Sequence, residues 1–253
     1  MTILLDKLNS IGAVVLSAGK GTRLNCEDVP KVMLEIGSKP IVSYIVETLI
    51  DIGFKKEQIM LVVGYQGEII KKYLGDGVSY AIQSEQLGTA HASLTGIKEL
   101  PKNIKQVLVL GGDDSAFYTK ETLEKFLENH LDEKATVSLL VGEISADIQK
   151  QQIGRVIKGK DGWEIIEKEN LKDEQFDLKE ISTGTFVFDR EWFEKNYKNI
   201  EKIKNLGEYG LPSMFSLVKE QGLKINVVKL ENINEWFGIN TSEELEMANK
   251  RLK

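Results

Sequence analysis

The chain has 253 residues, 42% of them hydrophobic and 28% charged, and its 33 Lys and Arg against 39 Asp and Glu give a net charge of −6. This composition is ordinary for a globular protein with a large apolar core, and the acidic balance argues against a general nucleic-acid binder, which needs a basic face. The single cysteine, Cys26, excludes an intramolecular disulfide and a cysteine-based zinc cluster, and two histidines are too few for a histidine-rich metal centre.

Two short apolar runs open the chain, and Asp6 and Lys7 separate them. This interruption argues against a secretory signal, and no stretch approaches the ~18 consecutive apolar residues of a membrane span. We therefore expect a cytoplasmic protein. The second run, residues 12–17, is rich in β-branched side chains and ends in a glycine-rich turn, which is typical of a buried parallel strand.

Strands and helices then alternate over roughly 140 residues, a pattern typical of a Rossmann-like, mostly parallel α/β sheet with helices on both faces. Further strands are predicted at 59–63, 78–82, 106–110 and 135–141, and helices at 39–50, about 67–73, about 89–100 and about 120–130. In the first of these helices, Pro40 suits the first turn, and Ile41, Ile45 and Leu49 share one face.

The pattern changes at about residue 150. Residues 154–157 and 163–167 flank a Gly-Lys-Asp-Gly turn and predict a β-hairpin, and a further strand is predicted at 181–188. The α/β pattern returns with a helix at 211–220, a strand at 224–229 and a final helix from about 242. We therefore expect one domain over residues 1–253, with a β-rich insertion that lies over the ligand site.

The strongest local signal follows the first strand, where Ser17, Ala18, Gly19 and Gly21 are small residues in a run that ends in Thr22-Arg23. Small residues let backbone amides approach a ligand, and consecutive N–H groups at a strand end form an anion-binding concavity. The run matches neither the P-loop nor the dinucleotide-binding pattern, and a bare glycine turn is the alternative. The cations Arg23 and Lys31 favour phosphate binding.

The run from Leu16 to Leu24, followed by Pro30-Lys31, resembles the signature of sugar-phosphate nucleotidylyltransferases. The resemblance implies that the loop surrounds the triphosphate of a nucleoside triphosphate and that two cations hold its phosphates. The loop residues to which it assigns nucleotide binding are Ala18, Gly19, Gly21 and Thr22, and the catalytic cations are Arg23 and Lys31.

Residues 83–92 resemble the uridine-binding segment of N-acetylglucosamine-1-phosphate uridylyltransferases. The resemblance implies that Gln83, Gly88 and Thr89 contact the uracil ring, and a side-chain amide can both donate to and accept from a pyrimidine edge. The alternative is a polar loop in which Thr89 caps the next helix. We expect His91 to be a structural helix residue rather than a general base.

Asp113 follows the apolar strand 106–110, and the carboxyl ends of such strands face the ligand crevice of an α/β sheet. The resemblance implies that Asp113 and Asn240, the latter in Phe-Gly-Ile-Asn, are ligands of Mg²⁺, which favours a few protein oxygens together with phosphate and water. Asp114 is the neighbouring alternative, but it does not align with the family's aspartate.

Motifs in the insertion follow one another in the same order as those of the sugar-binding part of the family. The resemblance implies that the sugar-binding residues are Gly154, Glu167, Ser182 and Thr183. Gly154 would contact the sugar through its backbone, and Glu167 would accept from sugar hydroxyls or, as the alternative, be an ordinary hairpin carboxylate. Three departures are Ser182 in place of Asn, Asp-Ser after Asp113 in place of x-Pro, and residues 210–213 in place of Tyr-Leu-Thr-Asp.

The resemblance implies a Mg²⁺-dependent transfer from an NTP, expected to be UTP, to a sugar-1-phosphate, expected to be N-acetylglucosamine-1-phosphate. Its nucleotide-binding part would be about 11–145, its sugar-binding part about 150–230, and the returning metal-ligand loop and last helix 231–253. Cytidylyl, guanylyl or thymidylyl transfer and a non-catalytic sensor are the alternatives. The expected partners of this chain are these small-molecule substrates, and neither nucleic acid nor a membrane is expected to bind. Whether the chain forms a homo-oligomer is left open. No hexapeptide repeat of an acetyltransferase domain is present.

Overall fold

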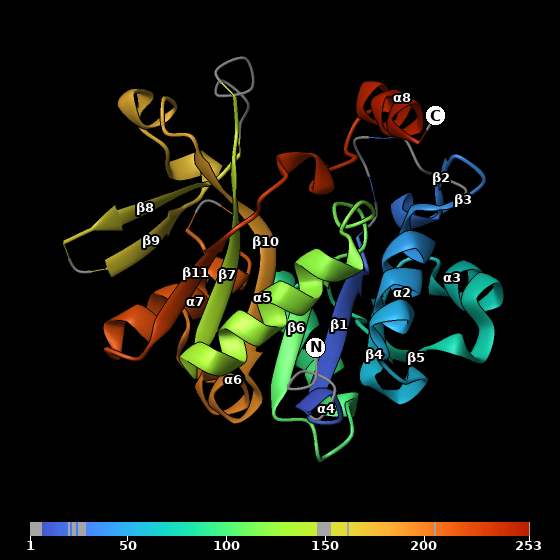
Figure 1. The fold of residues 1–253 in the computed structure, drawn as a ribbon, viewed down its shortest axis with the longest axis horizontal. Coiled ribbons are helices and arrows are strands. Elements are labelled where there is room, and N and C mark those ends of the chain that lie inside the picture. The colour runs from blue at the N-terminus through green and yellow to red at the C-terminus, as the bar shows by residue number, and fades with distance from the viewer. Residues whose placement is uncertain are drawn as a thin grey trace.

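The computed structural model describes residues 7–19, 21, 24, 29–145, 153–160, 162–204 and 206–252. Its centre is a sheet with the strand order β11-β7-β10-β6-β1-β4-β5, from which the hairpin β8–β9 continues (Figure 1). The strands are β1 (Ile11–Ser17), β4 (Ile59–Val63), β5 (Ser79–Ile82), β6 (Gln106–Gly111), β7 (Val137–Glu143), β8 (Arg155–Gly159), β9 (Gly162–Ile166), β10 (Glu180–Asp189) and β11 (Ile225–Lys229). A separate pair joins β2 (Glu35–Ile36) to β3 (Lys39–Pro40).

The sheet is mostly parallel, as predicted. β1 pairs in parallel with β4 and β6, β4 with β5, and β7 with β11. The antiparallel pairs are those of β10, which runs between β6 and β7 and also pairs with β8, and the pair within the hairpin β8–β9. Strand β10, expected at 181–188, therefore belongs to the centre of the main sheet, and the hairpin β8–β9 is attached to it through the pair Ile181 and Arg155.

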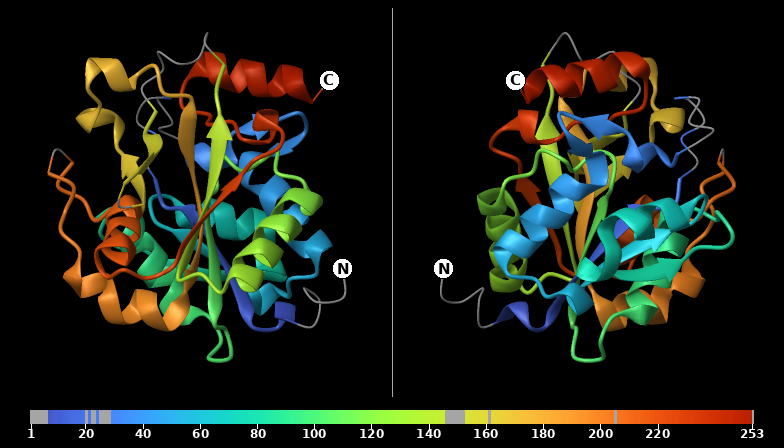
Figure 2. Two further views of the ribbon diagram at one scale, coloured as in Figure 1. Left: turned by 60° about the vertical axis from the view of Figure 1, so that its left-hand side comes forward. Right: turned by 90° about the vertical axis from the view of Figure 1, so that its right-hand side faces the viewer.

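Helices cover both faces of the sheet, which confirms the predicted layers (Figures 1 and 2). The helices are α2 (Ile41–Ile52), α3 (Gly67–Leu74), α4 (Thr89–Glu99), α5 (Lys120–Glu133), α6 (Arg190–Asn196), α7 (Leu211–Glu220) and α8 (Ser242–Arg251). Alternation along β1 separates the two cores: Val15 packs in the cluster with α2 and α5, and Val14 packs in the cluster with α4, α6 and α7. None of the described helices combines the length and apolar character that crossing a membrane requires.

The observed bounds differ from the predicted ones by up to three residues, and the differences have local causes. Pro40 was expected in the first helical turn, but it precedes α2 as its N-cap, because it also pairs in the short β2–β3 ladder. Helix α5 continues past His130 to Glu133, because Leu131 still packs against the core and Lys134 ends the helix in the left-handed conformation.

β10 has an irregularity that matters for the site. Its pairing with β7 shifts register between Ser182 and Phe186, so the strand bulges over residues 183–185. Bulges redirect side chains and are common beside ligand sites. The indole N–H of Trp236 donates to the Thr183 carbonyl at 2.9 Å and holds this bulge against the returning C-terminal segment.

His130 connects α5 to the sheet and predicts a pH-dependent stability. Its Nε2–H donates to Gln106 Oε1 at 2.9 Å, its Nδ1 accepts from the Ser138 hydroxyl at 2.8 Å, and the side chain is 1% exposed. Burial lowers the pKa of His130 from 6.5 to about 4. Below pH 6.5 the unfolded chain binds a proton at His130 that the folded chain does not bind. The contribution of His130 to stability is therefore constant above that pH and falls between about pH 6.5 and 4.

We expect the free energy of unfolding to fall by about 1.4 kcal/mol per pH unit in this window, and by about 3 kcal/mol over all of it. Urea unfolding of the wild type and of His130→Leu at pH 7.5, 6.5, 5.5 and 5.0 tests this. The variant should be less stable at pH 7.5 but lose less stability on acidification. Equal pH slopes in the two proteins would contradict the prediction.

Candidate active site

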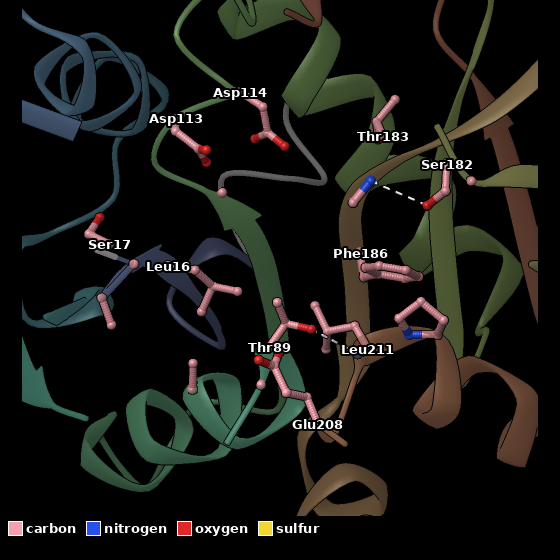
Figure 3. Close-up of a pocket in the computed structure, with 18 of the residues that line it drawn as sticks. Leu16, Ser17, Thr89, Asp113, Asp114, Ser182, Thr183, Phe186, Glu208 and Leu211 are labelled. Carbon is pink, nitrogen blue, oxygen red and sulfur yellow. Dashed lines mark hydrogen bonds between the residues drawn. The ribbon is translucent and has the colours of Figure 1, made fainter. Parts of the chain in front are cut away.

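A cavity of about 470 Å³ opens at the carboxyl ends of β1 and β6, between the start of α4, the bulge of β10 and the hairpin β8–β9 (Figure 3). It brings together residues predicted for both parts of the chain. The predicted residues that line it are Ala18, Gly19, Lys31, Gln83, Gly88, Thr89, Asp113, Gly154, Glu167, Ser182 and Thr183.

The glycine-rich run reaches the cavity directly after β1. Gly19 lines the cavity, and the carbonyl of Ala18 accepts from the side-chain amide of Gln86 at 2.7 Å. Gly21 has a φ of 64° and lies against the stem of Lys31 rather than among the lining residues. The predicted Thr22 and Arg23, like Cys26, lie outside the described residues.

Lys31 joins the two predicted metal ligands. Its ammonium donates to the Asp113 carboxylate and to Asn240 Oδ1, the latter at 2.8 Å, and its side chain is 12% exposed. The three residues are far apart in the chain, and backbone hydrogen bonds hold the segments of Asp113 and Asn240 together. The N–H of Phe237 donates to the Asp114 carbonyl at 3.2 Å, and that of Ile239 donates to the Asp113 carbonyl at 3.3 Å.

The same three residues show whether a divalent cation would fit here. One carboxylate oxygen and one amide oxygen converge on a positive charge, which at present is the ammonium of Lys31. Oxygen donors of this kind suit Mg²⁺, which usually takes few protein ligands and completes its shell with phosphate and water. Within the described ranges no cluster of three or more His, Cys, Asp or Glu side chains could hold a metal by itself. Asp113 and Asn240 therefore fit a Mg²⁺ ion that also depends on substrate oxygens.

The segment predicted to contact the base lies beside the glycine-rich run. Gln83 is 5% exposed, and its amide nitrogen lies 3.0 Å from His91 Nδ1 and 3.4 Å from the Gly88 carbonyl. His91 lies in α4, and this contact is consistent with the structural role expected for it. Gln86, which sequence analysis did not single out, connects this segment to Ala18.

Thr89 does not cap α4, so the capping alternative was wrong. The N-cap residue is Gly88, without a side-chain hydrogen bond, and the Thr89 hydroxyl instead accepts from the N–H of Leu211 at 3.0 Å. Further bonds join Tyr209 N–H to the Leu87 carbonyl and Ala90 N–H to the Tyr209 carbonyl, both at 2.8 Å. A Cβ on Gly88, whose φ is 107°, would lie 2.6 Å from the Tyr209 carbonyl, so this junction requires glycine.

The predicted acceptor residues meet on the opposite side of the cavity. The N–H of Ser182 donates to the Gly154 carbonyl at 3.4 Å, and the Ser182 hydroxyl accepts from the Gly184 N–H at 3.3 Å. Glu167, at the end of the hairpin, is half-buried and lines the cavity beside Gly154. The hydroxyl of Thr183 donates to the Leu140 carbonyl at 2.7 Å, so this side chain is used within the sheet.

Asp114, which sequence analysis set aside, also lines the cavity. Its Oδ1 atom is buried and has no hydrogen-bond partner among the described residues. Burial, together with the neighbouring Asp113 carboxylate, raises the pKa of Asp114 to about 8, against the opposing effect of the Lys31 ammonium. One sequence signal pointed to this loop, because the chain departs from the family pattern directly after Asp113. Ser115 stands in place of the proline, and its hydroxyl donates to the Gly111 carbonyl.

A protein-family model and known proteins match this chain over nearly all of its length. The model of the family described as nucleotidyl transferase matches residues 12–253. The bifunctional protein GlmU of Exiguobacterium sibiricum is 34% identical over 243 residues, which is 95% of this chain and 53% of that protein. The bifunctional protein GlmU of Symbiobacterium thermophilum is 34% identical over 250 residues, which is 97% of this chain and 52% of that protein. The chain thus spans about half the length of these curated relatives.

A solved structure from Bacillus anthracis, described as a glucose-1-phosphate thymidylyltransferase in complex with sucrose, has the same fold. It superposes with a TM-score of 0.76 over 95% of this chain and 94% of the other, at 20% sequence identity. At this identity the likeness concerns the fold alone. It agrees with the observed α/β architecture.

Proposed function

Because this chain belongs to the nucleotidyl transferase family, we propose that it forms an NDP-sugar and pyrophosphate from an NTP and a sugar-1-phosphate. We propose UTP as the donor and N-acetylglucosamine-1-phosphate as the acceptor. The observation that carries the proposal is one cavity lined by the glycine-rich run, the base segment, Lys31, Asp113 and the acceptor residues. Asn240 is joined to it through its hydrogen bond with Lys31.

The chemistry requires alignment and charge stabilisation rather than a nucleophilic side chain. A phosphate oxygen of the sugar-1-phosphate, already anionic, attacks the α-phosphorus of the NTP in line. A new P–O bond forms as the bond between the α-phosphorus and the bridging oxygen breaks, and pyrophosphate carries away the electron pair. Binding both substrates in one cavity makes the step effectively unimolecular, and fixed charges stabilise the transition state.

The chain's own residues would divide this work between them. Lys31 and Arg23 would bind the phosphates and stabilise the charge that develops on them. Asp113 and Asn240 would hold Mg²⁺, which when bound supplies further charge neutralisation at the reacting phosphates. The nearby position of Lys31 relative to both oxygen ligands supports this assignment.

The remaining residues would select the two substrates. Backbone groups at Ala18, Gly19 and Gly21, together with the Thr22 side chain, would surround the triphosphate. The base would be recognised by Gln83, Gly88 and Thr89, and the sugar by Gly154, Glu167, Ser182 and the backbone of Thr183. In this proposal the chain is one domain, with a nucleotide-binding part at about 11–145 and a sugar-binding part at about 150–230.

The test is pyrophosphate release with Mg²⁺ in a panel of four NTPs crossed with N-acetylglucosamine-1-phosphate, glucose-1-phosphate and other sugar phosphates. We expect a signal selective for UTP and strongest with N-acetylglucosamine-1-phosphate. Asp113→Ala is the negative control. A signal selective for another NTP or sugar would replace the proposed substrates while keeping the reaction. Silence across the panel, with UTP binding seen by calorimetry, would favour a non-catalytic nucleotide-sugar sensor.

A further inference from the structure

Two buried side-chain oxygens that line the cavity have no hydrogen-bond partner among the described residues. They are Ser17 Oγ, at the end of β1, and Asp114 Oδ1, after β6. Native proteins pair nearly all buried polar atoms, because an unpaired one loses its hydrogen bonds to water without replacement. Such an atom in the wall of a ligand cavity therefore indicates a group that the ligand supplies.

The Asp114 carboxylate lies between Asp113 and the bulge of β10. A Cβ built on Gly111 would lie 2.5 Å from Asp114 Oδ1 and 3.1 Å from Asp113 Oδ1. Figure 3 shows the Asp114 carboxylate above the cavity, between Asp113 and the strand of Ser182 and Thr183. A Cβ built on Gly184, in the bulge of β10, would lie 3.8 Å from Asp114 Oδ2. The base segment, by contrast, meets the glycine-rich run at Gln86 and Ala18, on the other side.

The residues around Asp114 keep its carboxylate in this position. A Cβ on Gly111 would lie 2.5 Å from Asp114 Oδ1, so glycine at position 111 leaves the space that the carboxylate fills. The Ser115 hydroxyl bonds to the Gly111 carbonyl, and the N–H of Phe237 bonds to the Asp114 carbonyl at 3.2 Å. The loop is thus fixed on both sides of Asp114, while its side-chain Oδ1 is left unpaired.

The position of the carboxyl group, rather than its chemistry alone, limits the ligand group. A carboxyl group can accept from a sugar hydroxyl or, when protonated, donate to a phosphate oxygen. Its Oδ2 lies beside the bulge of β10, where the predicted acceptor residues lie, and the group that this part of the cavity would meet is a sugar hydroxyl. Resting on the proposed function, we propose that Asp114 is a specificity-determining residue that binds a hydroxyl of the acceptor sugar. Ser182, on the same strand as Gly184, is shorter than the asparagine common in the resembling family, and Asp114 supplies a polar contact from the facing wall.

Direct binding of N-acetylglucosamine-1-phosphate by calorimetry tests this without requiring turnover. We expect Asp114→Ala to weaken binding by roughly 10- to 100-fold, the effect of losing a buried hydrogen bond to a substrate hydroxyl. UTP affinity and the Mg²⁺ concentration for half-maximal activity should stay within about twofold, as for a group that touches only the acceptor. Asp51→Asn, an exposed carboxylate on α2, is the matched control and should bind like the wild type.

A series of monodeoxy sugar-1-phosphates identifies the hydroxyl. The analogue that lacks the hydroxyl bound by Asp114 should bind the wild type as weakly as the parent sugar binds Asp114→Ala. The variant should bind this analogue and the parent sugar with equal affinity. The thermal midpoint of Asp114→Ala should equal or exceed that of the wild type, because the substitution removes an unpaired buried oxygen.

Two results would overturn the proposal: unchanged sugar affinity in Asp114→Ala, or loss confined to UTP and Mg²⁺, which would assign Asp114 to the phosphate side. Absence of pyrophosphate release by the wild type would refute the transferase reaction instead. The binding series would still decide the role of Asp114 in that case.

Discussion

Asp113→Ala should lower turnover about a thousandfold, because a metal that neutralises reacting phosphates contributes several kcal/mol to the barrier. Asp113 is the one carboxylate in the Lys31–Asp113–Asn240 group, and an alanine leaves only the amide oxygen of Asn240 for a cation. The measurement is kcat for pyrophosphate release as a function of Mg²⁺ concentration.

The controls separate the loss of a metal ligand from damage to the fold. Asp113→Asn keeps one oxygen at the same position and should retain more activity than Asp113→Ala at high Mg²⁺ or Mn²⁺. Asp51→Asn should behave as the wild type. Near-wild-type turnover in Asp113→Ala would show that the metal is held elsewhere, and equal losses in the alanine and asparagine variants, both insensitive to metal concentration, would point the same way.

Lys31→Met should have two opposite effects. Turnover should fall about a hundredfold or more, because a cation at the reacting phosphates is lost. Binding of Mn²⁺ to the protein without nucleotide should become about tenfold tighter or better, because the Lys31 ammonium no longer competes for Asp113 and Asn240. Electron paramagnetic resonance of free Mn²⁺ measures the second effect directly.

The second effect has a mechanistic consequence. In the wild type, the nucleotide phosphates would draw the ammonium of Lys31 away from Asp113, so that the NTP and the metal assist each other in binding. Lys39→Met, which removes an exposed lysine paired with Glu47 at the surface, is the control and should leave Mn²⁺ affinity unchanged. Weaker or unchanged Mn²⁺ binding in Lys31→Met would contradict the competition.

The elements that sequence analysis predicted well are those with a strong local pattern. The run at 106–110 is apolar enough to identify a buried strand, and β6 occupies Gln106–Gly111. Helix α6 was not predicted, because its seven residues are mostly polar and only Phe193 is buried. The two-residue strands β2 and β3 are too short to leave any pattern.

Features that depend on distant contacts could not be predicted. The central place of β10 follows from its pairing with β6, whose partner residues lie 77 to 83 positions earlier in the chain. No local pattern encodes such an order of strands. The local sequence suggested that the Thr89 hydroxyl caps a helix, but this hydroxyl instead accepts from the N–H of Leu211, which is distant in the chain. The burial of Asp114 likewise depends on Gly111 and on the C-terminal segment around Phe237.

The antiparallel strand β10 also limits how this architecture can be divided. Because β7 pairs with β10 on one side and β11 on the other, a fragment ending at residue 145 would leave β7 without neighbours and expose an edge of β6. The parts proposed to bind the nucleotide and the acceptor are therefore not exchangeable modules. The hairpin β8–β9, attached to β10 at Ile181, is the smaller unit that a chimera between relatives could replace while the sheet stays intact.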